Sequence, residues 1–193
     1  MKIFEKGFYH IYNQGNNKQP IFLLNRDYEY FIELCHKYIV PRCQILAWCL
    51  LPDHFNFIIQ INEKSLERIV WGGNEMPSVS NGFQLLQSIY AKTVNARENR
   101  TGSLFRQKTK AKLLETKDHA FLAFRYVNQK PLKTQLVKSR DDWTFSSYNE
   151  YLGYSKPELS NVELGEEIFG IDTVNFKTMM AEDLNEEELK EIL

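Results

Sequence analysis

The chain has 193 residues, which is enough for one domain with a sizeable core and an appendage. No apolar run approaches the roughly 20 residues that a membrane span needs, and the first residues lack the apolar core of a signal peptide, so we expect a cytoplasmic protein without membrane contact. The three cysteines lack CxxC spacing, which argues against a disulfide framework and against a zinc site.

The formal net charge of −1 hides two segments of opposite charge. The first, here called the basic segment, spans residues 100–140 and holds Arg100, Arg106, Lys108, Lys110, Lys112, Lys117, Arg125, Lys130, Lys133, Lys138 and Arg140 against only Glu115 and Asp118. Beyond Pro157 acidic residues predominate. Cations interleaved with aromatic residues suit a polyanion with stackable bases. The alternative is a solvated helix face whose aromatic residues belong to the core.

The first half of the chain predicts two strands that form a hairpin, preceded by a strand and a helix. Residues 8–13 alternate aromatic and polar side chains and predict a strand, followed by a polar loop over 14–19. Apolar residues at helical spacing predict a helix from Asn25 or Asp27 to about Ile39. Strands over 44–51 and 54–61 are expected to pair across the Pro52-Asp53 turn.

The second half predicts two helices around one further strand. After a flexible connection at 72–78, we expect a helix from Ser80 or Asn81 to about Asn99, a strand over 108–115 and a helix from Asp118 to Lys130-Pro131. This order predicts an α+β fold, an antiparallel sheet with helices largely on one face and a free face for a ligand.

We expect two parts in the chain, a domain over residues 1–154 and an acidic tail over residues 155–193. The acidic tail has short apolar groups between many carboxylates, so we expect weak packing and one short helix from Asn185.

Two polar side chains share one face of the 54–61 strand. His54 and Asn56 point to the side opposite Phe55 and Phe57, because successive side chains alternate across a strand. Each needs a partner if it is covered. They therefore mark a candidate site, and the alternative is a wet sheet face on which His54 is simply solvated.

Four stretches resemble the HUH-type single-stranded DNA transposases of the insertion-sequence-200-like and REP-associated tyrosine transposase families. Residues 9–22 resemble the first strand and its polar loop, and 49–60 the histidine block. Residues 125–131 (RYVNQKP) resemble the nucleophile helix, and 142–148 (DWTFSSY) a W-x-x-S-S-Y stretch. The resemblance implies a ferredoxin-like fold, single-stranded or hairpin DNA as partner, Mg²⁺ or Mn²⁺ as cofactor and a possible homodimer.

The resemblance also assigns roles to individual residues, and this chain departs from two of them. Tyr126 matches the tyrosine nucleophile and His54 the first metal-binding histidine, but Asn56 stands where the second histidine belongs. Lys130 stands where an Asn or Gln ligand is expected, four residues after the tyrosine, and an ammonium has no lone pair to give to a metal. Gln129 is the alternative third ligand. Weak metal binding is therefore expected.

Three functions remain open at this stage. The first is an active transposase with Tyr126 as nucleophile. The second is a DNA-binding descendant with little or no cleavage, which contacts DNA through Lys108, Lys110, Lys112, Arg125 and Lys130. The third is a structural or protein-interaction module whose basic segment packs against its own acidic tail. For the first of these, Tyr126 on an amphipathic helix has the competing interpretation of a core or interface aromatic residue.

Overall fold

The computed structural model describes residues 1, 3–106 and 108–192. Its centre is a four-stranded antiparallel sheet with the strand order β2-β3-β1-β6. The strands are β1 (Gly7–Gln14), β2 (Gln44–Leu51), β3 (His54–Ile61) and β6 (Lys110–Leu114). The expected hairpin across Pro52-Asp53 is present, and the α+β class with an antiparallel sheet is confirmed.

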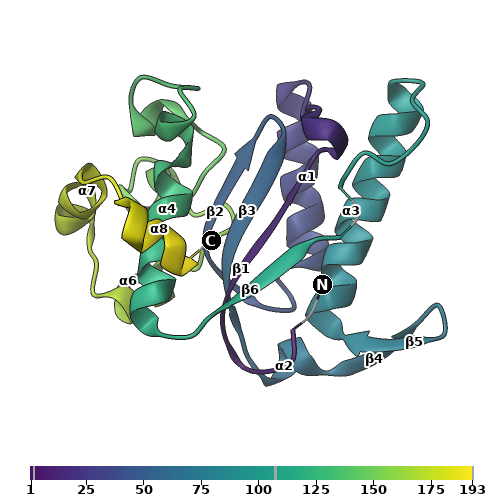
Figure 1. Cartoon of the computed structure of the whole chain (residues 1–193), viewed down its shortest axis with the longest axis horizontal. Helices are drawn as coiled ribbons and strands as arrows, with labels where there is room; N and C mark the ends of the chain where they lie inside the picture. Colours follow the sequence, from purple (N-terminus) through teal and green to yellow (C-terminus); the bar gives the residue numbers. More distant parts are fainter. Residues whose placement is uncertain (2, 107, 193) are drawn as a thin grey trace.

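Two long helices cover one face of the sheet, α1 (Asn25–Tyr38) and α3 (Ser78–Arg97) (Figure 1). Their apolar faces pack with the side chains of Tyr9, Ile11, Phe55 and Phe57 in one cluster. The helices approach closely at Gly82, where an added Cβ would lie 2.4 Å from the carbonyl oxygen of Tyr38. A side chain at that position would therefore push α3 away from the helix end it packs against.

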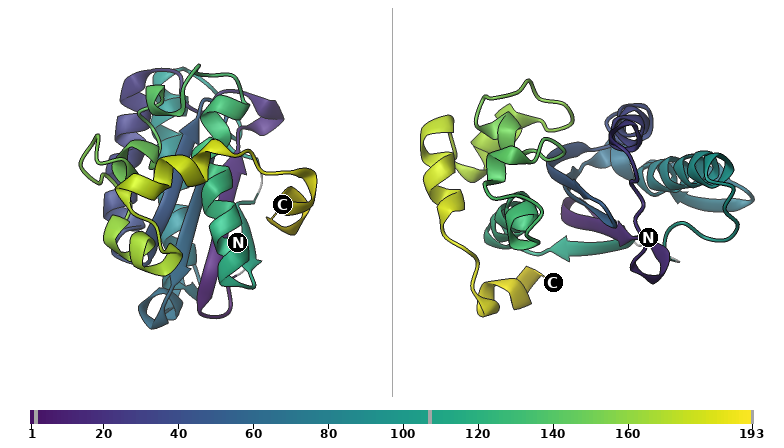
Figure 2. Two further views of the ribbon diagram at one scale, coloured as in Figure 1. Left: turned by 90° about the vertical axis from the view of Figure 1, so that its left-hand side faces the viewer. Right: turned by 90° about the horizontal axis from the view of Figure 1, so that it is seen from above.

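The second face of the sheet is covered as well, in contrast to the expectation of helices largely on one face. Helix α4 (Lys117–Lys133) lies across β2, β3 and β1, and its residues Ala120, Phe124 and Val127 are buried there (Figure 2). Because α4 presents an apolar stripe, it has to cover sheet surface rather than stand free in solvent. Within the described residues, the end of this face where β1 finishes and β3 begins is left open for a site.

The acidic tail packs more tightly than expected. It forms three helices, α6 (Val162–Phe169), α7 (Thr173–Ala181) and α8 (Glu186–Ile192), which line up along α4 in Figure 1. Phe176, Met180 and Ile192 are fully buried, so the apolar groups between the carboxylates are core residues. The last helix begins where expected, because the Asn185 side chain accepts from the backbone N–H groups of Glu187 and Glu188. The division at residue 154 stays a prediction.

Smaller elements complete the chain. The expected flexible connection is a hairpin of β4 (Arg68–Trp71) and β5 (Asn74–Pro77), whose turn residues Gly72 and Gly73 both have positive φ, as a two-residue hairpin turn requires. The remaining pieces are η1 (Asn16–Lys18), α2 (Glu63–Leu66), η2 (Arg140–Asp142) and α5 (Tyr148–Tyr151). No helix in the described part of the chain is long and apolar enough to span a bilayer.

Candidate nucleic-acid interface

A cavity of about 420 Å³ lies where β1 ends, β3 begins and α4 crosses them. Strand register brings its sheet residues together, since Asn56 is paired with Tyr12 and His54 with Gln14. Side chains directly opposite in an antiparallel pair lie on the same face. His54 and Asn56 therefore share a face, as predicted, and that face also carries His10, Tyr12 and Gln14.

Helix α4 supplies the other wall of the cavity through Tyr126 and Lys130, which are one turn apart. The ammonium of Lys130 donates to the Tyr126 hydroxyl at 3.0 Å. The Tyr126 ring lies edge-on to His10 with ring centroids 6.0 Å apart. The structure thus brings Tyr126, Lys130, His54 and Asn56 into one cavity from segments about 70 residues apart in the sequence.

His10 also lies in this cavity, although no role was predicted for it. Its side chain is buried, and its Nε2 lies 3.0 Å from Asn56 Oδ1, so the neutral imidazole donates to the amide oxygen. Burial lowers the pKa of His10 to about 4, against the opposing effect of the Asn56 hydrogen bond, and Lys130 and Lys112 lower it further. In the sequence, His10 is a polar residue two positions before Tyr12 and therefore on the same face of the strand. The β1–β3 register is needed to show that it meets Asn56.

His54 is held by its neighbour in the sequence. Its Nδ1 lies 2.5 Å from an Asp53 carboxylate oxygen, and its Nε2 is buried without a hydrogen-bond partner among the described residues. Burial and the nearby Lys130 lower the pKa of His54, and the Asp53 carboxylate opposes them. A neutral ring that donates from Nδ1 to Asp53 leaves the lone pair of Nε2 facing the cavity.

Gln129 is not brought to the cavity. Its side chain is fully buried on the other side of α4, where Nε2 donates to the carbonyl oxygens of Met180 at 3.2 Å and Glu182 at 2.6 Å. One residue of helix turns the side chain by about 100° relative to Lys130, which is enough to aim it at the acidic tail. Gln129 therefore joins α4 to the tail and does not replace a third metal ligand.

The residues of the cavity do not fit a divalent cation. Within residues 3–106 and 108–192 no three His, Cys, Asp or Glu side chains lie together in a way that could hold a metal. The Asn56 oxygen is already bound to His10, and the ammonium of Lys130 acts on both imidazoles. A resident cation beside two imidazoles repels a second one, and Mg²⁺ prefers anionic oxygen ligands.

Of the five basic residues predicted to contact DNA, Lys130 lies in the cavity and the other four fall into two groups. Lys112 donates to the Glu191 carbonyl oxygen at 3.1 Å, and Arg125 donates to the Glu182 carbonyl oxygen at 2.9 Å and lies 3.6 Å from the Glu188 carboxylate. Lys108 and Lys110 are exposed and form no ion pair in the described part of the chain. The acidic tail thus engages the first group and leaves the second open.

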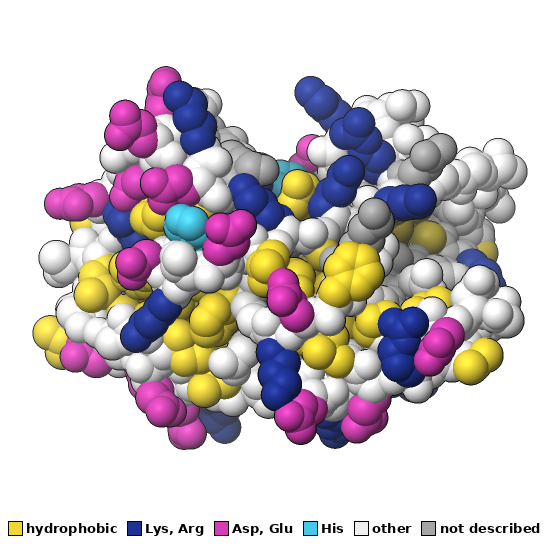
Figure 3. Space-filling model, turned by 60° about the horizontal axis from the view of Figure 1, so that its bottom comes forward, with side chains coloured by type: hydrophobic (Ala, Val, Ile, Leu, Met, Phe, Trp, Pro, Cys, Tyr) yellow, Lys and Arg dark blue, Asp and Glu magenta, His cyan; other side chains and the backbone are white. Residues whose placement is uncertain are grey.

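The surface around the cavity shows the same division. Figure 3 shows a notch between two lobes, with Lys and Arg side chains gathered in and beside it and acidic side chains concentrated on one lobe. Because one lobe is formed by α4 and the tail helices, the acidic lobe is the one that carries the tail (Figure 1). A chain of phosphates would meet positive charge at the notch.

Comparison with known proteins finds a similar solved structure. No protein-family model matches the chain, and no curated protein does. A REP-associated tyrosine transposase solved bound to a REP hairpin matches over 84% of this chain and 91% of its own, with a TM-score of 0.60 at 15% sequence identity. The fold that the resemblance implies is therefore confirmed, and the chain has the fold of a REP-associated tyrosine transposase.

Proposed function

We propose that this chain is a transposase-like protein that binds single-stranded or hairpin DNA, and that its metal-dependent cleavage is reduced or absent. The observation that carries the proposal is the Lys130 ammonium 3.0 Å from the Tyr126 hydroxyl inside the cavity. The family places a metal ion to receive the scissile phosphate, whereas here a lysine presents its own positive charge beside the tyrosine. The hairpin bound by the similar transposase supports DNA as the partner.

A DNA phosphate suits the donors that the cavity offers. Lys130 presents an ammonium, Tyr126 a hydroxyl and Asn56 an Nδ2 group that is buried without a partner among the described residues. Hydrogen bonds from a charged donor to a phosphate oxygen are stronger than neutral ones. Lys108 and Lys110 extend the positive surface along the edge strand β6, where a strand of DNA can continue.

Cleavage needs more than binding, because the stabilisation of negative charge on the phosphate has to be stronger in the transition state than in the bound DNA. A divalent ion supplies this by coordinating the phosphate oxygens. A single ammonium binds the phosphate in the ground state almost as well as in the transition state, so binding is retained and acceleration is small. We assign Tyr126 as the nucleophile for any cleavage that remains, since its hydroxyl lies in the same cavity as Lys130.

The interaction-module hypothesis is kept as the second candidate because the basic segment does contact the acidic tail. Arg125 and Lys112 bind tail carbonyl groups, and Arg140 donates to the Asp183 carboxylate at 3.1 Å. Among the described residues, no hydrogen bond or ion pair joins Lys108, Lys110 or Lys130 to the tail. An interaction module predicts no use for them in DNA binding, so they separate the two hypotheses. A homodimer stays a prediction from the resemblance.

Binding of single-stranded DNA at varied salt tests the proposal. Each neutralised phosphate contributes about −0.7 to the slope of log K against log salt concentration, so three contacts give a slope of about −2. The double variant Lys108→Gln with Lys110→Gln should reduce the steepness by about 1.4. The control Lys37→Gln with Lys156→Gln makes the same change in net charge at exposed lysines elsewhere and should leave the slope nearly unchanged.

Cleavage is assayed with the same protein and DNA as the binding experiment. DNA incubated with Mg²⁺ or Mn²⁺ should form little or no covalent adduct with the protein. An abundant adduct that is lost in Tyr126→Phe would show full transposase chemistry and overturn the proposed loss of cleavage. Absence of salt-dependent DNA binding, or equal slopes in the two double variants, would instead favour the interaction module.

A further inference from the structure

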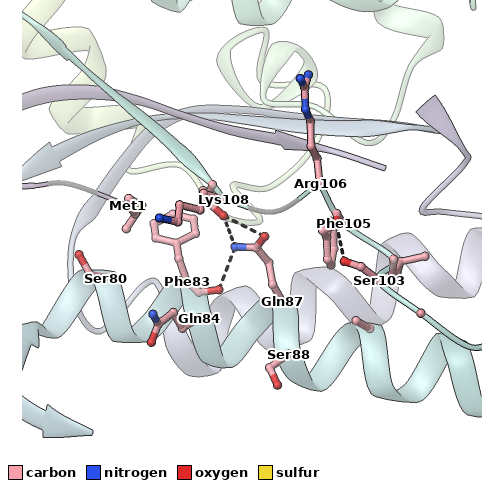
Figure 4. Close-up of a pocket in the computed structure, with 14 residues that line it drawn as sticks. Met1, Ser80, Phe83, Gln84, Gln87, Ser88, Ser103, Phe105, Arg106 and Lys108 are labelled. Atoms are coloured by element: carbon pink, nitrogen blue, oxygen red, sulfur yellow. Dashed lines mark hydrogen bonds between the residues drawn. The ribbon is translucent and has the colours of Figure 1, made fainter. Parts of the chain in front are cut away.

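A second and larger cavity, of about 670 Å³, lies on the other face of the sheet (Figure 4). Helix α3 forms one side, and the segment leading into β6 forms the other. Its walls are apolar, from Phe83, Leu104 and Phe105, and its rim is polar, from Ser80, Gln84 and Ser88. The volume is in the range of ligand pockets in proteins.

Two polar side chains of the rim, Gln84 and Ser88, are exposed, and a third, Ser80, is buried. Ser80 is buried, and its hydroxyl has no hydrogen-bond partner in the described part of the chain. Gln84 and Ser88 lie one turn apart on the exposed side of α3, and Figure 4 shows both on the helix below the pocket. An amide and two hydroxyls offer donors and acceptors together, as the edge of a heterocyclic base requires.

A hydrogen-bonded frame keeps the pocket open. Asn13 donates to Gln87 Oε1 at 2.8 Å, and Gln87 Nε2 donates to Thr109 Oγ1 at 2.6 Å and to the Phe83 carbonyl oxygen at 3.1 Å. These bonds tie α3 to β1 and to the segment before β6. These polar atoms bond to one another, so the frame shapes the pocket while Gln84 and Ser88 on the rim are left to bind.

The same residues connect this pocket to the cavity of Tyr126. Asn13 and Gln14 line that cavity, Asn13 donates to the Arg106 carbonyl oxygen at 3.2 Å, and the Arg106 N–H donates to the Gln14 carbonyl oxygen at 2.8 Å. Arg106 and Lys108 line the larger pocket and are exposed. The cationic side chains of Arg106 and Lys108 therefore lie between the larger pocket and the cavity of Tyr126. The two are separated by the end of β1 and the segment that enters the edge strand.

We propose that the larger pocket binds an unpaired nucleobase of the same DNA strand whose phosphate lies at Lys130. The inference rests on the proposed function and adds a base-binding site to it. The flat face of the base lies against the apolar wall, its polar edge meets Ser80, Gln84 and Ser88, and its backbone phosphate lies by Arg106 and Lys108. The α3 rim then determines which base is preferred, whereas the cations bind any sequence.

The test uses the full chain and short single-stranded oligonucleotides in which each position in turn is abasic. One position, or two adjacent ones, should weaken binding about fivefold or more, since stacking and edge contacts of one base are worth at least about 1 kcal/mol. The variant Gln84→Leu with Ser88→Leu should bind the intact oligonucleotide as weakly as the wild type binds the abasic one. It should show no further loss at that position.

A matched control is Ala96→Leu, on the same helix at an exposed position outside the pocket. It should bind like the wild type and keep the abasic effect. Equal affinity at every abasic position, with retained salt-dependent binding, overturns the base pocket and leaves the proposed function standing. An abasic effect that persists in the double variant also overturns it. Absence of binding to every oligonucleotide overturns both.

Discussion

The buried imidazole of His10 should make the stability of this protein depend on pH. Its pKa is lowered to about 4 in the folded chain, from an ordinary value of 6.5. The unfolded chain therefore takes up a proton as the pH falls below about 6.5, whereas the folded chain does not until about pH 4. Stability is lost as the pH falls through this window, because the unfolded state binds more protons there.

The size of the loss follows from the two pKa values. At about 1.4 kcal/mol for each unit of difference, the full effect is about 3 kcal/mol, of which about 2 kcal/mol is lost by pH 5. Neighbours of His10 that bear on it are Lys112, Lys130 and the hydrogen-bonded Asn56. The two lysines stay charged across the window, so they do not change the sign of the effect.

The variant His10→Gln removes the titration while keeping an amide donor for Asn56. The difference in unfolding free energy between this variant and the wild type, measured by urea unfolding, should change by about 2 kcal/mol in favour of the variant when the pH is lowered from about 7.5 to about 5. If the stability difference between His10→Gln and the wild type is constant over this pH range, the imidazole is not held neutral and the reasoning from burial fails.

Three further predictions concern the site and its support. Asn56→His with Lys130→Asn should raise divalent-ion affinity, measured calorimetrically, by more than the two single changes together, because ligands of one ion couple; additive or absent gains would contradict this. Asp183→Asn with Glu188→Gln should speed DNA association at low salt, since both carboxylates face the basic segment, and an unchanged rate would place the DNA elsewhere. Arg97→Met should lower the free energy of unfolding by about 3 kcal/mol, because it leaves the buried carboxylate of Asp27 without its ion-pair partner. A loss below about 1 kcal/mol would show that the backbone N–H groups of Leu23 and Leu24 are enough to stabilise the carboxylate.

The prediction about the acidic tail has to be tested by neutralising charges rather than by deletion. Removal of residues 158–193 would uncover Phe124 and Val127 on α4, together with the part of β2 that α6 covers. Loss of that packing would destabilise the fold, and a change in DNA affinity could then not be attributed to the charge of the tail. The two carboxylate-to-amide changes alter the field at the notch and leave the apolar contacts of the tail intact.

Local patterns in the sequence were sufficient for the parts of the fold that depend on neighbours along the chain. The alternation over 54–61 correctly placed His54 and Asn56 on one face, and helical spacing predicted α1, α3 and α4. Helix α4 runs past Pro131 to Lys133, because a proline in the last turn removes only one backbone hydrogen bond. These features are set within one or two turns of chain, where the side-chain period is a reliable guide.

Features set by distant segments were not predicted, because a local pattern carries no information on contacts between residues far apart in the sequence. His10 meets Asn56 only through the register of strands 46 residues apart, and Gln129 is aimed by carbonyl groups more than 50 residues further on. Burial of Phe176 and Met180 in the tail depends on α4 lying on the second face of the sheet. No local pattern contains these pairings, so the tail was expected to be weakly packed.

The two departures from the family pattern are coupled by electrostatics. Lys130 lowers the pKa of both His10 and His54, and a histidine at position 56 would add a third imidazole beside the same ammonium. An amide at position 56 removes one of these rings and gives His10 a neutral acceptor at 3.0 Å. Lys130 then has a hydroxyl and an open cavity before it, which is an arrangement that favours an anion. Under the proposed function, the residues at positions 56 and 130 therefore act together: the resemblance implies a metal-binding site here, and the cavity of this chain provides a cation instead.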